Sequence, residues 1–164
     1  MDNQNNAAHS TTNIYNPLIE AAKPVFILVN AMQQTTSQLS TDSLINKFSL
    51  LINNFEENAE KNGARYDAIQ AAKYCLCTFV DELAVRAGWA DETWSKNSLL
   101  VSFYDETWGG ERFFEIIQNL KQDPDKNIDL LEFMYLCLQF GYKGKYQVLN
   151  SGELEIDKIK RDLL

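Results

Sequence analysis

Apolar residues recur at intervals of three and four along almost the whole chain, and this spacing is the feature that most restricts the fold. From Pro17 onward, successive segments place apolar side chains on one face of a helix. An alternation of apolar and polar residues, which would indicate a strand, is limited to residues 147–149. The sequence therefore predicts an all-α fold.

Capping residues and glycines divide the chain into about seven or eight helices. The first is expected from Pro17, and Pro24 inside it predicts either a kink or a helix that starts near Ala22. One short helix is expected in the tryptophan-containing connector between Gly88 and Gly110. The other helices are expected near residues 40–63, 65–87, 110–123, 127–140 and 151–164.

Composition indicates one globular domain with a short tail. Hydrophobic residues make up 45% of the 164 residues, which is enough to build a core. Residues 1–13 are polar and are predicted to be a disordered N-terminal tail, whereas residues 14–164 form a single helical domain. No run of about 20 apolar residues and no signal peptide is present, so the chain as given is not expected to span a membrane.

Charge and residue usage argue against several classes of function. A net charge of −8 disfavours nucleic acid and anionic membrane surfaces and favours basic partner surfaces. The three cysteines are expected to be buried, reduced thiols. Because the only histidine is His9 in the tail, neither a zinc site nor a Cys-His nucleophile can be assembled. We expect no cofactor, no small-molecule substrate and no enzymatic activity.

Asp81 and Glu82 are adjacent carboxylates near the end of the helix expected over residues 65–87. The helix dipole disfavours negative charge at this end, so the pair predicts either a compensating partner or a functional groove. The simpler alternative is two solvated acids that flank the buried stripe.

Three further acids, Asp105, Glu106 and Glu111, surround Trp108 and the two glycines that follow it. The cluster could imitate the paired acids of a glycosidase. The simpler interpretation is that Glu111 stabilises the start of a helix, and that the glycines let this helix begin beside a bulky ring.

The tryptophans and the segment 141–146 have plain structural interpretations. Trp108 is expected in the core because aromatic residues flank it, and Trp89 is the better candidate for an exposed position. The sequence GYKGKY at 141–146 predicts a tight turn, because it lacks the spacing and the hydroxyl residue of a phosphate-binding loop.

Three segments together resemble the DotU/TssL (IcmH/DotU) family of type VI and type IVB secretion components. They are CTFVDE at residues 77–82, followed by Trp94; LLVSFYDETWGGERFF at 99–114; and LEFMYLCLQFGYKGKY at 131–146. Their order and spacing agree with the family from about Pro17 to the C-terminus. The departures are Tyr104, where the family usually has histidine, and Lys145, where arginine is usual.

The resemblance implies a cytoplasmic domain of two packed three-helix bundles in a hook-like arrangement. In the family a C-terminal transmembrane helix, absent from this chain, anchors the full protein in the bacterial inner membrane, so this chain is expected to be soluble. The implied function is a structural scaffold that links an IcmF/TssM-like inner-membrane protein to a TssK-like baseplate protein, with a homodimer through the anchor. The alternatives are a type IVB DotU-like stabiliser of an IcmF protein and a carboxylate-dependent hydrolase.

The resemblance also implies an acidic groove between the bundles, where Asp81 and Glu82 match an Asp-Glu pair of the family. With Glu106 and Glu111 this pair is the expected partner-binding surface, with salt-sensitive binding and charge-reversal variants that fold like the wild type. Six other motif residues are expected to be structural: Trp94, Trp108, Gly109, Gly110, Tyr135 and Gly141.

Overall fold

The computed structural model describes residues 15–34, 40–148 and 151–163, and the predicted tail 1–13 lies outside these ranges. Within them the chain forms eight α-helices and one 3-10 helix and contains no strand, which confirms the predicted all-α fold. The elements are α1 (Pro17–Gln34), α2 (Thr41–Lys61), α3 (Tyr66–Arg86), α4 (Glu92–Lys96), α5 (Leu99–Tyr104), α6 (Arg112–Leu120), α7 (Ile128–Gln139), η2 (Gly144–Val148) and α8 (Gly152–Leu163).

Helix α1 begins at Pro17 and continues through Pro24, so the alternative of a later start near Ala22 is wrong. The side chain of Asn16 caps the helix, because its Oδ1 accepts hydrogen bonds from the backbone N–H groups of Leu18 at 3.0 Å and Ile19 at 3.2 Å. Proline is well suited to the first turn, where its missing N–H leaves no hydrogen bond unmade.

The connector before α6 contains two short helices, α4 and α5, where one was expected. Each has its own cap: the Asp91 side chain accepts from Trp94 N and the Ser98 side chain accepts from Val101 N. Asp105 then ends α5 in a left-handed conformation, with φ of 55°. The strand-like residues Gln147 and Val148 belong to the 3-10 helix η2.

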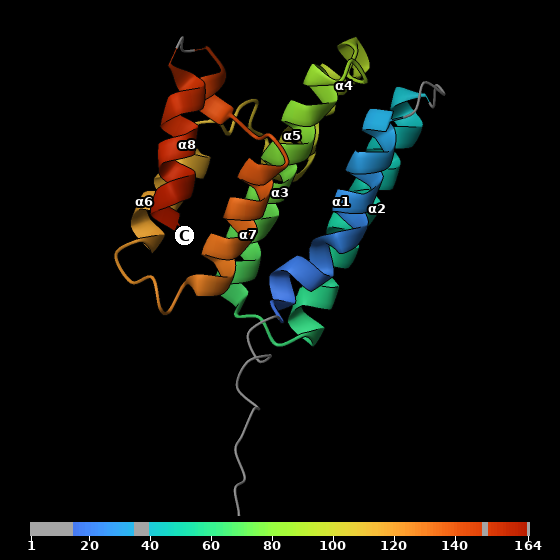
Figure 1. The fold of residues 1–164 in the computed structure, drawn as a ribbon. Coiled ribbons are helices and arrows are strands. Elements are labelled where there is room, and N and C mark those ends of the chain that lie inside the picture. The colour runs from blue at the N-terminus through green and yellow to red at the C-terminus, as the bar shows by residue number, and fades with distance from the viewer. Residues whose placement is uncertain (1–14, 35–39, 149–150, 164) are drawn as a thin grey trace, which may run out of the picture.

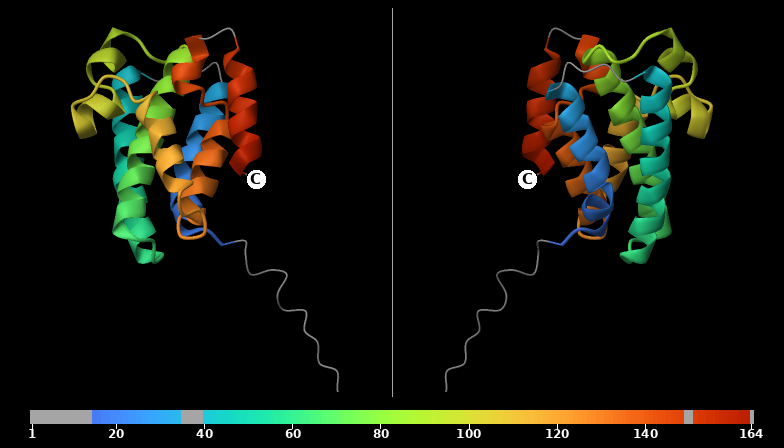
Figure 2. Two further views of the ribbon diagram at one scale, coloured as in Figure 1. Left: turned by 90° about the vertical axis from the view of Figure 1, so that its left-hand side faces the viewer. Right: turned by 90° about the vertical axis from the view of Figure 1, so that its right-hand side faces the viewer.

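The helices form two groups of three that lie side by side (Figure 1). Helices α1, α2 and α3 make one group, and α6, α7 and α8 make the other, with α3 packed against α7 where the groups meet. Helices α4 and α5 pack against α2 and α3 at the same end of the molecule as η2 (Figure 2). This arrangement surrounds α3 with contacts from both groups.

One hydrophobic core runs through both groups. The ring of Phe26 on α1 lies 5.3 Å from that of Phe79 on α3 and 6.1 Å from that of Phe133 on α7, between ring centroids. The three cysteines are buried and free, as predicted. In the described ranges, no helix is both long and apolar enough to cross a membrane.

Candidate functional site

One face of α3 carries polar side chains that reach the connecting segments of the chain. Tyr74, Thr78, Asp81 and Glu82 follow one another at intervals that place them on the same side of a helix. Each of them bonds to a segment that lies outside α3. This face therefore organises the loops that form the candidate site.

Asp81 holds the start of α5 and the buried ring of Trp94. Its Oδ1 accepts from Trp94 Nε1 at 3.1 Å and from Leu99 N at 3.0 Å, and its Oδ2 accepts from Leu100 N at 3.0 Å. A carboxylate in this position satisfies N–H groups that have no partner within the helix. Burial raises the pKa of Asp81 to about 6, although these hydrogen bonds act in the opposite direction.

Glu82 holds the loop between α7 and η2. Its Oε1 accepts from Gly144 N at 2.7 Å, and its Oε2 accepts from Lys143 N at 2.8 Å. Arg86 lies 3.4 Å from Oε2 and donates to the carbonyl of Gly141 at 2.7 Å. Burial raises the pKa of Glu82, and the two backbone bonds oppose this shift.

The glycines of two motifs sit where a larger side chain would collide. At Gly109, a Cβ would lie 2.9 Å from both Thr78 Oγ1 and Tyr74 Oη. Gly144 has φ of +53° and lies against Phe114, where a Cβ would be 2.7 Å from the ring. Both positions therefore require glycine because of close packing, and at Gly144 also because of the left-handed backbone.

A hydrogen-bonded set of side chains extends from the same face toward α6. Tyr74 Oη donates to Glu106 Oε2 at 2.7 Å, and Arg112 forms an ion pair with Glu106 at 3.3 Å. The hydroxyls of Thr78 and Tyr142 are 3.2 Å apart in the interior. Glu106 is thus bonded within the fold.

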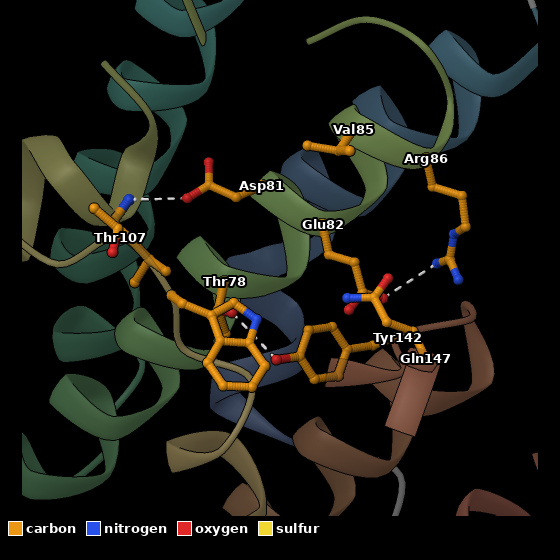
Figure 3. A pocket seen from close by; sticks show the side chains of 10 residues that line it. Thr78, Asp81, Glu82, Val85, Arg86, Thr107, Tyr142 and Gln147 are labelled. Atoms are coloured by element: carbon orange, nitrogen blue, oxygen red, sulfur yellow. Dashed lines mark hydrogen bonds and ion pairs between the residues drawn. The ribbon is translucent and has the colours of Figure 1, made fainter. Parts of the chain in front are cut away.

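A pocket of about 290 Å³ lies over the polar face of α3 (Figure 3). Asp81 and Glu82 line it, but they point to different walls, Asp81 toward Leu100 at the start of α5 and Glu82 toward Tyr142 and Gln147. The lining residues are Thr78, Asp81, Glu82, Val85, Arg86, Leu100, Thr107, Trp108, Tyr142 and Gln147.

The pocket includes only part of the expected acidic surface. Asp81 and Glu82 are in its wall, whereas Glu106 and Glu111 are not among its lining residues. Because the Asp81 and Glu82 carboxylates hold at least three backbone or side-chain partners each, replacing them with lysine would remove contacts within the fold. The geometry argues against the expectation that such charge-reversal variants fold like the wild type.

The other motif residues have diverse surroundings. Trp94 is fully buried and meets Phe48 edge-on, with 6.3 Å between ring centroids. Tyr135 is half-buried, and its hydroxyl accepts from Gln139 Nε2. Gly141 follows α7 with φ of +105°, a conformation that favours glycine.

The prediction that Trp108 lies in the core is wrong, because 53% of the residue is exposed. Phe113 is the buried ring in this segment, with 4.3 Å between its centroid and that of Tyr142, whereas Trp108 lies at the surface. Trp89, the better candidate for exposure, is half-buried and stacks on Phe48 at 6.4 Å.

Sequence reasoning missed the pocket residues Val85, Arg86 and Gln147. A signal for Val85 was present, since it lies four residues after Asp81 and so on the same face of α3. No local pattern pointed to Gln147, because only the packing of η2 brings it to α3.

The fold and site define a helical domain whose motif residues hold loops around a surface pocket. The chain matches the family described as "Type VI secretion system protein DotU" over residues 17–164. It therefore belongs to the DotU family of type VI secretion system proteins.

Solved structures of TssL proteins share this fold. The TssL crystal structure from Vibrio cholerae is 33% identical, with 91% of this chain and 95% of that chain covered and a TM-score of 0.80. The cytoplasmic domain of TssL from Acinetobacter baumannii is 25% identical, with coverages of 89% and 96% and a TM-score of 0.79. SciP/TssL from enteroaggregative Escherichia coli 042, at 20% identity, coverages of 91% and 86% and a TM-score of 0.75, shares the fold. A search of curated proteins found no match.

Proposed function

We propose that this domain is a non-enzymatic docking component of a type VI secretion system. It links an inner-membrane complex that contains an IcmF/TssM-like protein to a TssK-like baseplate protein. It works at the cytoplasmic face of the inner membrane, to which a C-terminal transmembrane helix of the full-length protein holds it. The docking surface is acidic and comprises the region of Asp81, Glu82, Glu106 and Glu111.

The observation that carries this proposal is the pocket over α3, which is open to the surface and lined by two carboxylates in a chain of net charge −8. An excess of negative charge attracts basic partner surfaces and accelerates their encounter. Because the chain belongs to the DotU family of type VI secretion system proteins, the partners are expected among the proteins of that system.

The acids around Trp108 give little support to the alternative of a hydrolase. Asp105 and Glu111 are exposed, and Glu106 is bonded to Tyr74 and Arg112. None of these three acids lines the pocket. A pair of catalytic carboxylates would need to face a common substrate site.

The proposal is tested by measuring binding of the purified domain to the TssK-like protein and to the cytoplasmic part of the IcmF/TssM-like protein at two salt concentrations. Glu111→Lys is the suitable variant, because Glu111 is exposed and its side chain makes no capping bond to α6. We expect the Kd for at least one partner to rise by about fivefold, and added salt to weaken wild-type binding.

Glu57→Lys on α2 is the matched control, since it makes the same charge change at an exposed position away from the pocket. Circular dichroism checks that both variants fold. If neither partner binds, or if binding is insensitive to salt and equal in the two variants, the acidic docking surface is wrong.

A further inference from the structure

Trp108 is an exposed aromatic side chain held against the backbone. Its ring lies so close to Gly110 that a Cβ there would come within 2.5 Å of Trp108 Cζ2. Trp108 lines the pocket over α3, and so does Val85, which is 65% exposed. A large aromatic ring that is both exposed and braced loses little conformational freedom on binding, which is typical of interface hot spots.

The pocket beside this ring carries more negative than positive charge. Asp81 and Glu82 are in its wall, and Arg86 is the one cationic residue among its lining side chains. The guanidinium of Arg86 already donates to the carbonyl of Gly141 and lies beside Glu82. The net charge of these three groups is negative when both acids are ionised.

The Glu82 carboxylate keeps capacity to accept a further hydrogen bond. An ionised carboxylate has about four acceptor sites, and Glu82 has three partners. Asp81 has Trp94, Leu99, Leu100 and the Ser98 side chain as partners, so an approaching cation would act on it mainly through charge. Burial raises the pKa of both groups in spite of these bonds, so an additional cation would relieve an energetic cost that the fold leaves uncompensated.

We propose that this pocket receives one arginine side chain of a protein partner, which stacks on the Trp108 indole and directs its guanidinium toward the carboxylates in the pocket wall. The aliphatic part of the arginine lies along Val85 and Leu100, which are the aliphatic members of the lining. The inference rests on the proposed docking function and names the chemistry that the docking surface recognises.

Arginine fits these features better than other side chains do. Its planar guanidinium stacks on aromatic rings, is less strongly hydrated than an ammonium group and bonds to two acceptors at once. A leucine would cover the carboxylates without compensating their charge, which is costly. A phosphate group would be repelled by the same charge.

The test uses three short peptides that differ in one side chain, acetyl-Gly-Arg-Gly-amide and its citrulline and leucine counterparts. Citrulline has nearly the same shape as arginine but carries no charge. Each peptide is titrated into the ¹⁵N-labelled domain, and the indole N–H signal of Trp108 is followed by NMR. We expect the arginine peptide to shift this signal saturably and to bind more than tenfold more tightly than either of the others.

Two variants locate the binding. Trp108→Ala removes the ring, and Val85→Ala trims an exposed side chain whose removal leaves the core intact. In both variants the shifts of the Leu99 and Leu100 amides, which mark Asp81, should need severalfold more arginine peptide.

Equal binding of the arginine and citrulline peptides, tightest binding of the leucine peptide, or no binding of any peptide would overturn the inference. The peptide titration does not involve the secretion partners. If the peptides fail to bind as expected while partner binding stays salt-sensitive, the arginine pocket is wrong and the docking function stands. If the arginine peptide binds as expected but neither secretion partner binds, the docking function is wrong and the preference of the pocket for arginine stands.

Discussion

The most informative single residues in this domain are polar groups placed in a mostly apolar interior. Asp81, Glu82, Thr78 and Tyr142 all find partners there. Tyr104 is different: among the described residues, its hydroxyl is the buried side-chain oxygen that has no hydrogen-bond partner.

Tyr104→Phe is therefore expected to stabilise the domain by about 1 kcal/mol. The change removes a buried hydroxyl that loses its hydrogen bonds to water on folding and gains no hydrogen bond within the protein. Its matched control is Tyr142→Phe, which removes a buried hydroxyl that does have a partner, at 3.2 Å in Thr78. This control should destabilise the domain by about 1 kcal/mol. Urea unfolding measures both, and similar destabilisation by the two changes would contradict the assignment.

At the scale of elements, short helices in this domain depend on α3. Helix α5 has six residues and α4 has five, which is too short for either to be stable alone. Asp81 accepts hydrogen bonds from the backbone N–H groups of Leu99 and Leu100 at the start of α5 and from the indole N–H of Trp94 on α4. The stability of this region should thus respond to the ionisation of one carboxyl group.

Burial raises the pKa of Asp81 from 3.8 to about 6 in the folded protein, so the folded state holds a proton that the unfolded state has released over this range. The contribution of Asp81 to the free energy of unfolding therefore decreases as pH rises from about 4 to about 6 and is level above that. With about 1.4 kcal/mol for each pKa unit, the contribution is about 3 kcal/mol.

Asp81→Asn imitates the protonated carboxyl group and should lack this decrease. Urea unfolding of both proteins at several pH values isolates the effect, since the other titrating groups are common to both. The difference in unfolding free energy between variant and wild type should grow in favour of the variant as pH rises toward 6. A difference that is constant over the range would show that Asp81 titrates as it does in the unfolded chain.

At the scale of the whole molecule, the two groups of helices share one core instead of forming separate units. Phe26 on α1 contacts rings of both α3 and α7, and Glu82 and Arg86 join the end of α3 to the loop after α7. Neither group can lose its structure without exposing apolar surface of the other.

Thermal unfolding should accordingly proceed in a single cooperative transition. Circular dichroism in the far ultraviolet follows all helices, and tryptophan fluorescence follows Trp89, Trp94 and Trp108, of which Trp94 is fully buried beside α2 and α3. The two signals should give the same Tm. Two separated transitions would mean that α1–α3 and α6–α8 unfold independently.

The amino-acid sequence alone predicts the all-α class, the main helices and the acidic pair Asp81 and Glu82 of the pocket wall. Apolar spacing, caps such as Ser40, and helix-ending glycines act over a few residues, so they can be read locally. The helix dipole is also a local property, and it predicts either a compensating partner or a functional groove for the acidic pair that follows Phe79 and Val80.

Packing in three dimensions determines which groups compensate the two carboxylates and which side chains face outward. Asp81 and Glu82 bond to groups 13 to 62 residues away, and no local pattern predicts such pairings. Trp108 and Phe113 are similar as aromatic residues, yet contact with Tyr142 buries Phe113 whereas Trp108 stays at the surface. These outcomes depend on how segments distant in sequence pack together, and packing is a property of the whole fold.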